Sequence, residues 1–226
     1  MKTGKKLRKL FWIDIWTLIF GAIFFVGLIV LFIAFADVLL TGLAYGFFGP
    51  HLEPKDYGTF KALIVAVVVL LIPLVVVTIM NWVVTFQLRE ANDKFLAAFL
   101  MYMLRVIIAA TFLTSWGRIG RTIGDIFNLL AGIFLAGAVR MCVEKANRGL
   151  ANVIKAYIIC YSIFGGITIL LDILLFHVDS TGLGTLYLLS ILTGIGIYIW
   201  FLVLLWKASN VMMKYEEESE YQQMLY

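Results

Sequence analysis

The sequence has 226 residues, of which 63% are hydrophobic and 14% are charged, and its net charge is +4. A soluble globular chain has about 45–50% apolar and about 25% charged residues. The composition therefore excludes an ordinary soluble domain and indicates a chain whose surface faces lipid. The small net charge gives no indication of a nucleic-acid partner, and none is expected.

The apolar residues are gathered into long segments, which we interpret as transmembrane helices. A hydrocarbon core about 30 Å thick needs roughly 20 apolar residues in a helix. The sequence therefore predicts an all-α, polytopic transmembrane bundle over residues 1–206. Six spans are expected, at residues 11–36, 62–85, 95–114, 122–141, 150–176 and 185–206. The fourth carries Asp125 and Asn128 in its first two turns, and without it the chain would have five spans.

The distribution of Lys and Arg predicts the side on which each end lies, because basic residues gather in the cytoplasmic segments of multispan proteins. With a cytoplasmic N-terminus, the basic residues on the outer side are Lys55, Lys61, Arg118 and Arg121. Arg105 lies within a span, and all the other basic residues are cytoplasmic. We therefore expect both ends in the cytoplasm and an even number of spans. The first apolar run is longer than the roughly 7–15 residues of a signal-peptide core, so it is expected to remain as the first span.

Two short segments of the sequence repeat one pattern. Residues 88–92 are Leu-Arg-Glu-Ala-Asn and residues 143–147 are Val-Glu-Lys-Ala-Asn, and each precedes a predicted span. Both are expected to be cytoplasmic turns in which the Asn caps free backbone N–H groups at the start of the next helix. The repetition indicates either turn chemistry common to such connections or a helical hairpin repeated in the same orientation.

Arg105 is the residue most indicative of function, because it lies near the middle of the third predicted span. A charge at this depth costs about 2.5–3.5 kcal/mol on insertion scales, so it should face the bundle interior or a wet cavity. Asp125 and Asp172 are its candidate partners. Arg105 is then either a contact for a substrate, ion or partner, or a structural bridge between helices. Pro73, at the centre of the second span, predicts a kink that serves either a gate or plain packing.

Small residues four positions apart recur in the last three predicted spans. The pairs are Gly132 and Ala136, Ser162 and Gly166, and Ser190 and Gly194. Such pairs let two helices approach closely and gain van der Waals contact. They favour close packing, either within one chain or between the subunits of a homo-oligomer.

Residues 207–226 are predicted to form an acidic cytoplasmic tail. Its acidic residues precede the sequence Tyr221-Gln222-Gln223-Met224. Tyr221 to Met224 resemble the tyrosine-based sorting signals bound by clathrin adaptors, and also the phosphotyrosine-x-x-Met ligands of certain SH2 domains. A phosphate on Tyr221 would add charge for an arginine-lined pocket to bind. The tail is therefore a sorting signal, a docking site or a solvated acidic segment.

No enzymatic, metal or cofactor site is expected. His51 and His177 are the two histidines, and neither stands at metal-ligand spacing from Cys142 or Cys160. The sequence shows no Ser-His-Asp set, no glycine-rich phosphate loop and no pair of intramembrane carboxylates.

Two functions fit these features. The first is an accessory, scaffold or trafficking partner of other membrane proteins, in the plasma membrane or an endosomal or lysosomal membrane. The general plan and Tyr221–Met224 resemble lysosome-associated transmembrane proteins, although that family has four spans and proline-tyrosine tail motifs. The alternative is a small oligomeric channel or transporter that uses Arg105 and its candidate partners. A polar cavity reaching Arg105 would favour transport, whereas a dry bundle with Arg105 bridged to an aspartate would favour a structural role.

Overall fold

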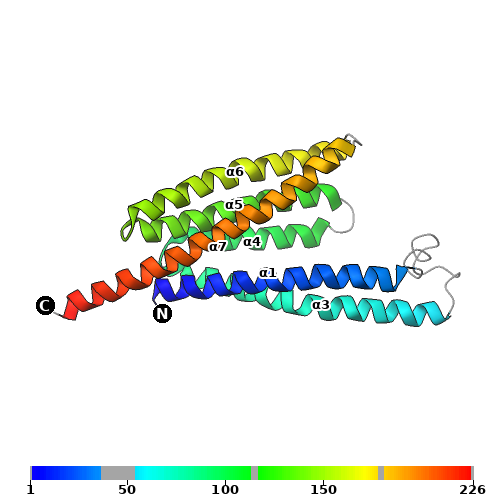
Figure 1. Ribbon diagram of the computed structural model, residues 1–226, viewed down its shortest axis with the longest axis horizontal. Coiled ribbons are helices and arrows are strands. Elements are labelled where there is room, and N and C mark those ends of the chain that lie inside the picture. The colour runs from blue at the N-terminus through cyan, green and yellow to red at the C-terminus, as the bar shows by residue number, and fades with distance from the viewer. Residues whose placement is uncertain (1, 37–53, 113–116, 178–180, 225–226) are drawn as a thin grey trace. The chain divides into compact units, whose positions relative to one another are not determined.

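The computed structural model describes residues 2–36, 54–112, 117–177 and 181–224, and all regular structure within these ranges is helical (Figure 1). The helices are α1 (Thr3–Ala34), α3 (Pro54–Gln87), α4 (Asp93–Phe112), α5 (Gly117–Glu144), α6 (Arg148–His177) and α7 (Thr181–Met224), with a short 3₁₀ helix η1 (Leu88–Glu90) between α3 and α4. The predicted all-α class is thus confirmed for the described residues. His51 lies outside these ranges.

Five of the helical segments are long and apolar enough to cross a membrane, which indicates an integral membrane protein. They are Thr3–Ala34, Lys61–Glu90, Ile119–Glu144, Arg148–Leu175 and Gly184–Met224. They correspond to the first, second, fourth, fifth and sixth predicted spans, so the predicted fourth span is one of the five. The third predicted span corresponds to α4, which has 20 residues and is not among them. Residues 113–114 of that span lie outside the described part of the chain.

Large exposed apolar side chains occupy a limited stretch of each long helix. On α1 they run from Trp12 to Ile33, and on α6 from Val153 to Leu174. On α7 a continuous set runs from Leu186 to Val203, and Tyr215, Tyr221 and Met224 are exposed further along the helix. Exposed apolar surface of this extent is unfavourable in water and suits contact with acyl chains.

The described residues form two compact units. One contains residues 1–12 and 82–226, and the other contains residues 13–81. In the first unit α5 packs between α4 and α6, and α7 packs against α6 and α5 (Figure 1). Its core is formed by fully buried apolar side chains from the start of α1, from η1 and from α4, α6 and α7. They include Leu7, Leu10, Leu88, Phe95, Ile154 and Leu205.

The second unit pairs residues of α1 with residues of α3. Gly27 of α1 faces the side chain of Leu70, which would lie 2.8 Å from a Cβ atom added at Gly27. The α-helix of α3 continues through Pro73 without interruption. Leu63 and Val77 of α3 are buried.

The two repeated sequence segments form turns with one hydrogen-bonding pattern. The carbonyl of the first residue accepts from the amides three and four positions on, at 2.9 and 3.4 Å for Leu88 and at 3.0 and 2.7 Å for Val143. The side chain of Asn92 or Asn147 then accepts a backbone amide of the following helix, at 2.9 Å in both turns. The predicted turns and their Asn caps are confirmed.

Candidate functional site: a polar cleft between α5, α6 and α7

A polar cleft with a volume of about 320 Å³ lies between α5, α6 and α7. Its charged residues are Arg121 and Asp125 of α5 and Asp172 of α6. The uncharged polar residues that line it are Asn128, Tyr161, Thr168, Tyr187 and Ser190. Three largely apolar helices therefore direct polar side chains toward a common space.

Helical spacing explains how the three helices share this cleft. Arg121, Asp125 and Asn128 are separated by four and three residues, so they lie on one face of α5. Tyr161, Gly165, Thr168 and Asp172 follow the same spacing on α6, and Tyr187, Ser190 and Gly194 on α7. The polar residues of these spans thus form three facing stripes.

Arg121 connects the three helices at the cleft. Its Nη2 donates a hydrogen bond to the Tyr187 hydroxyl at 2.6 Å and lies 3.7 Å from Oδ1 of Asp172. The Arg121 side chain is 58% exposed, whereas that of Asp172 is 20% exposed. The guanidinium therefore has N–H donors available beyond those used by Tyr187 and Asp172.

Arg105 is bound to an amide at the cleft. Its Nη1 donates to Oδ1 of Asn128 at 2.9 Å, and Asn128 lines the cleft. Neither of the two predicted partners, Asp125 and Asp172, forms an ion pair with Arg105 among the described contacts. Asp172 pairs with Arg121, and Asp125 lies near enough to Arg105 and Arg121 to interact electrostatically with both. Two cations and two anions consequently meet around the cleft, and Arg105 reaches it through Asn128.

Glycine at two positions makes room where α5 and α6 approach each other. A Cβ atom added at Gly132 would lie 2.6 Å from the ring and hydroxyl of Tyr161. Gly165 faces the Leu129 side chain at similarly close range. Ala136, the predicted companion of Gly132, is fully buried.

The other small residues are placed less uniformly. The Ser162 and Ser190 hydroxyls donate to carbonyls of their own helices, at 2.7 Å in each case. Gly194 is in the cleft wall, and a Cβ atom added there would lie 3.9 Å from the Phe164 ring. No described heavy atom lies within 4 Å of a Cβ atom added at Gly166. The close approach on α6 is therefore at Gly165, one position before the predicted residue.

A buried carboxylate in the second unit was missed by the sequence analysis. Asp14 of α1 is 5% exposed and accepts a hydrogen bond from Nδ2 of Asn81 of α3. The available signal was an aspartate within a predicted span, which requires a partner when it leaves water. Pro73 is also in this unit and is not among the residues that line the cleft.

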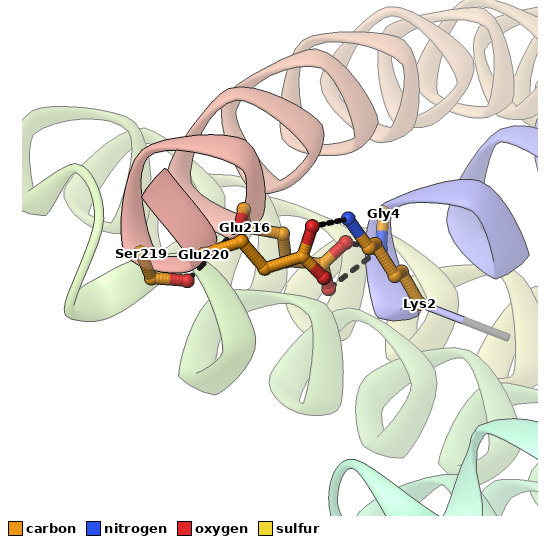
Figure 2. A network of polar contacts seen from close by, with 5 residues as sticks. All are labelled: Lys2, Gly4, Glu216, Ser219 and Glu220. Atoms are coloured by element: carbon orange, nitrogen blue, oxygen red, sulfur yellow. Dashed lines mark hydrogen bonds and ion pairs between the residues drawn. The ribbon is translucent and has the colours of Figure 1, made fainter. Parts of the chain in front are cut away.

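A polar junction between the first turns of α1 and the end of α7 was also missed. Figure 2 shows Lys2 paired with Glu220, and the backbone N–H of Gly4 directed at the Glu216 carboxylate. The Gly4 nitrogen lies 3.2 and 3.3 Å from the two Glu216 oxygens. Further along, Arg8 donates to Asn210 and stacks over the Trp206 ring, 3.4 Å from its centroid. We shall call these contacts the N–C junction.

The predicted tail continues α7 as a helix. The helix runs unbroken to Met224, and Tyr221 and Met224 are 65% and 77% exposed. The signal for the N–C junction was the complementary charge of the basic start and the acidic end of the chain. It was overlooked because the acidic residues were interpreted as a separate tail.

The part of the chain that the structure describes contains no group of three or more His, Cys, Asp or Glu residues able to hold a metal ion. The site is thus characterised by its ion pair, its amide and hydroxyl groups and its position between membrane-length helices. No known protein family, characterised protein or solved structure matches this chain.

Proposed function

We propose that this chain is a small channel or transporter that binds a polar solute in the cleft between α5, α6 and α7. The observation that supports this function is the polar cleft itself. Placing Arg121, Asp125 and Asp172 in contact with lipid would be costly, so such residues face a bundle interior or a water-filled cavity. A cleft with both charge signs and several hydroxyl groups offers a polar solute the contacts that it loses on leaving water.

The proposed architecture has six spans with both ends in the cytoplasm. The N–C junction joins the start of α1 to the end of α7, and contact between the two ends outside the apolar segments supports an even number of crossings. The 20 residues of α4 are about 30 Å long, which equals the thickness of the hydrocarbon core. The basic residues at the start of α1 favour the cytoplasmic side.

Access of water to the cleft is tested by cysteine labelling. In a chain with Cys142 and Cys160 replaced by serine, we compare Thr168→Cys with Ile167→Cys, using a charged, membrane-impermeant thiol reagent. Thr168 is a half-buried residue of the cleft wall, whereas Ile167 is 47% exposed on the apolar surface of α6. We expect cysteine at 168 to react at least tenfold faster, because a thiol in lipid does not ionise. Equal rates would rule out a water-filled cleft.

Transport itself is tested in proteoliposomes. Swelling rates are measured with glycerol, glycine and potassium chloride outside, against protein-free liposomes. Faster entry of at least one solute, reduced several-fold by Arg121→Gln, is the expected result. Arg140→Gln is the matched control, because Arg140 pairs within its own helix with Glu144 at 3.4 Å and is not a cleft residue. Entry of all three solutes at the protein-free rate would contradict the proposal.

The accessory or trafficking function remains a second candidate, and exposure of the tyrosine motif favours it. Tyr221 and Met224 project from the last turn of α7, where another protein can reach them. The predicted location is the plasma membrane or an endosomal or lysosomal membrane. Tyr221→Ala should shift the tagged chain between these membranes, whereas Tyr215→Ala, at a tyrosine that is also exposed, should not. An unchanged distribution of the Tyr221 variant would remove the sorting role.

A further inference from the structure

The basic residues from Lys2 to Lys9, at the start of α1 and just before it, fall into two sets. Lys2 and Arg8 belong to the N–C junction, and Lys6 Nζ binds the Gln87 carbonyl at 2.8 Å and Glu90 at 2.7 Å. Lys5 and Lys9, in contrast, are exposed and have no hydrogen bond or ion pair with any described residue. The fold therefore leaves two cations one helical turn apart directed outward.

These two lysines lie just beyond the apolar part of α1. The exposed large apolar side chains of this helix begin at Trp12, which is 51% exposed. Lys9 and Lys5 precede Trp12 by three and seven residues, which is about 5 and 10 Å along the helix axis. The headgroup layer on each side of a bilayer is about 5–8 Å thick. Lys9 therefore lies at the depth of the lipid headgroups, and Lys5 lies one turn further out, at the outer boundary of this layer.

Trp12 fixes the depth of this surface. Tryptophan prefers the boundary between headgroups and acyl chains, because its ring is apolar and its N–H is polar. Lys5, Lys9 and Trp12 follow the spacing i, i+4 and i+7, so they share one face of α1. Trp12 also contacts the Trp206 ring edge-on, with centroids 6.3 Å apart, so α7 supports the indole.

We propose that Lys5, Lys9 and Trp12 form a binding surface for the headgroup of an anionic phospholipid. An acidic protein would also match the charge of the two lysines. The lipid is favoured because the two lysines share their face with the exposed indole of Trp12, which prefers the boundary between headgroups and acyl chains. A ligand with an anionic head and an acyl chain satisfies both parts of the face. This proposal does not depend on the function of the cleft.

The test measures lipid retained by the purified full chain in detergent, using native mass spectrometry. Phosphatidylserine and phosphatidylcholine are added separately. We expect tighter binding of phosphatidylserine, reduced roughly 30-fold by the double variant Lys5→Gln/Lys9→Gln, because each lysine near an anionic surface contributes about 1 kcal/mol. The matched control is Lys145→Gln/Arg148→Gln, which removes two exposed cations from the α5–α6 turn.

Four results would overturn the proposal. The first is equal retention of the two lipids by the unaltered chain, and the second is a similar loss in the control variant. The third concerns Lys5→Arg/Lys9→Arg, which keeps both charges and should keep the preference for phosphatidylserine; loss of that preference would show that charge is not the cause. The fourth is displacement of the lipid by an acidic peptide in competition, which would indicate a protein partner instead.

Discussion

Gly4 is a residue at which the two ends of the chain approach each other closely. A Cβ atom added there would lie 2.6 Å from the Met213 backbone nitrogen and 2.7 Å from its Cγ atom. Because the nearest atom belongs to the backbone of α7, a side chain at position 4 must push the two helices apart. Glycine is thus required at this position by packing.

We predict that Gly4→Ala lowers the free energy of unfolding by about 1–3 kcal/mol, the usual cost of overpacking. The measurement is thermal unfolding of the purified chain in detergent. Gly21→Ala in the same helix serves as the control, because no described heavy atom lies within 4 Å of its added Cβ atom. That variant should be neutral or slightly stabilising, since Ala favours a helix over Gly. Equal melting temperatures for the two variants would contradict the close approach.

Asn81 stabilises the buried carboxyl group of Asp14 in the second unit. It donates its side-chain N–H to Asp14, which is almost completely inaccessible. We predict that Asn81→Leu destabilises the chain by about 1–3 kcal/mol, because a hydrogen bond to a buried polar group is lost. The control is Thr78→Val, since the Thr78 hydroxyl donates to the Leu74 carbonyl of its own helix, at 2.7 Å. Equal melting temperatures would show that Asp14 does not need this amide.

Residues whose environment is local could be predicted from the sequence, and residues whose environment depends on packing could not. Asn92 and Asn147 cap their helices as expected because a cap involves amides only two or three residues away. The partner of Arg105 depends on how α4 and α5 are rotated about their axes, and this rotation brings Asn128 to it. Arg121 was placed in an outer loop, yet helix α5 begins earlier than expected and carries it into the cleft.

At the scale of elements, α7 is the helix that differs most from expectation. Its 44 residues are about 66 Å long, roughly twice the thickness of the hydrocarbon core. Its predicted span lies within this helix, but the following residues continue as helix and contact α1. Glu216 then supplies the anion at the N-terminus of α1, whose own first turn contains no acidic residue. A carboxylate there is stabilised by the unpaired amides and by the helix dipole.

We therefore predict that Glu216→Ala loosens the first turn of α1. Hydrogen exchange at the Gly4 and Lys5 amides should become several-fold faster, because an N-terminal cap contributes about 0.5–2 kcal/mol. Glu217→Ala removes the same group from an exposed neighbouring position that has no described partner in the N–C junction, and its exchange should be unchanged. If both variants exchange at the wild-type rate, the carboxylate does not cap α1.

At the scale of the whole molecule, the number of crossings depends on α4. Among the described residues five helices are long and apolar enough to span a membrane, and an odd number of crossings would put the two ends of the chain on opposite sides. The N–C junction holds those ends together, which supports the proposal that α4 supplies a sixth crossing. Its described residues support this role, because Leu100, Leu104 and Ile107 expose apolar side chains on one face.

We predict that epitope tags at the two ends of the chain are accessible from the same side of the membrane. In intact cells neither tag should bind antibody, both should bind after permeabilisation, and a tag inserted at residue 45 should bind in both cases. This pattern follows from six crossings with basic residues on the cytoplasmic side. If only one terminal tag needed permeabilisation, the chain would cross five times and α4 would lie outside the hydrocarbon core. If both terminal tags bound in intact cells, the crossing number would stand and the orientation would be reversed.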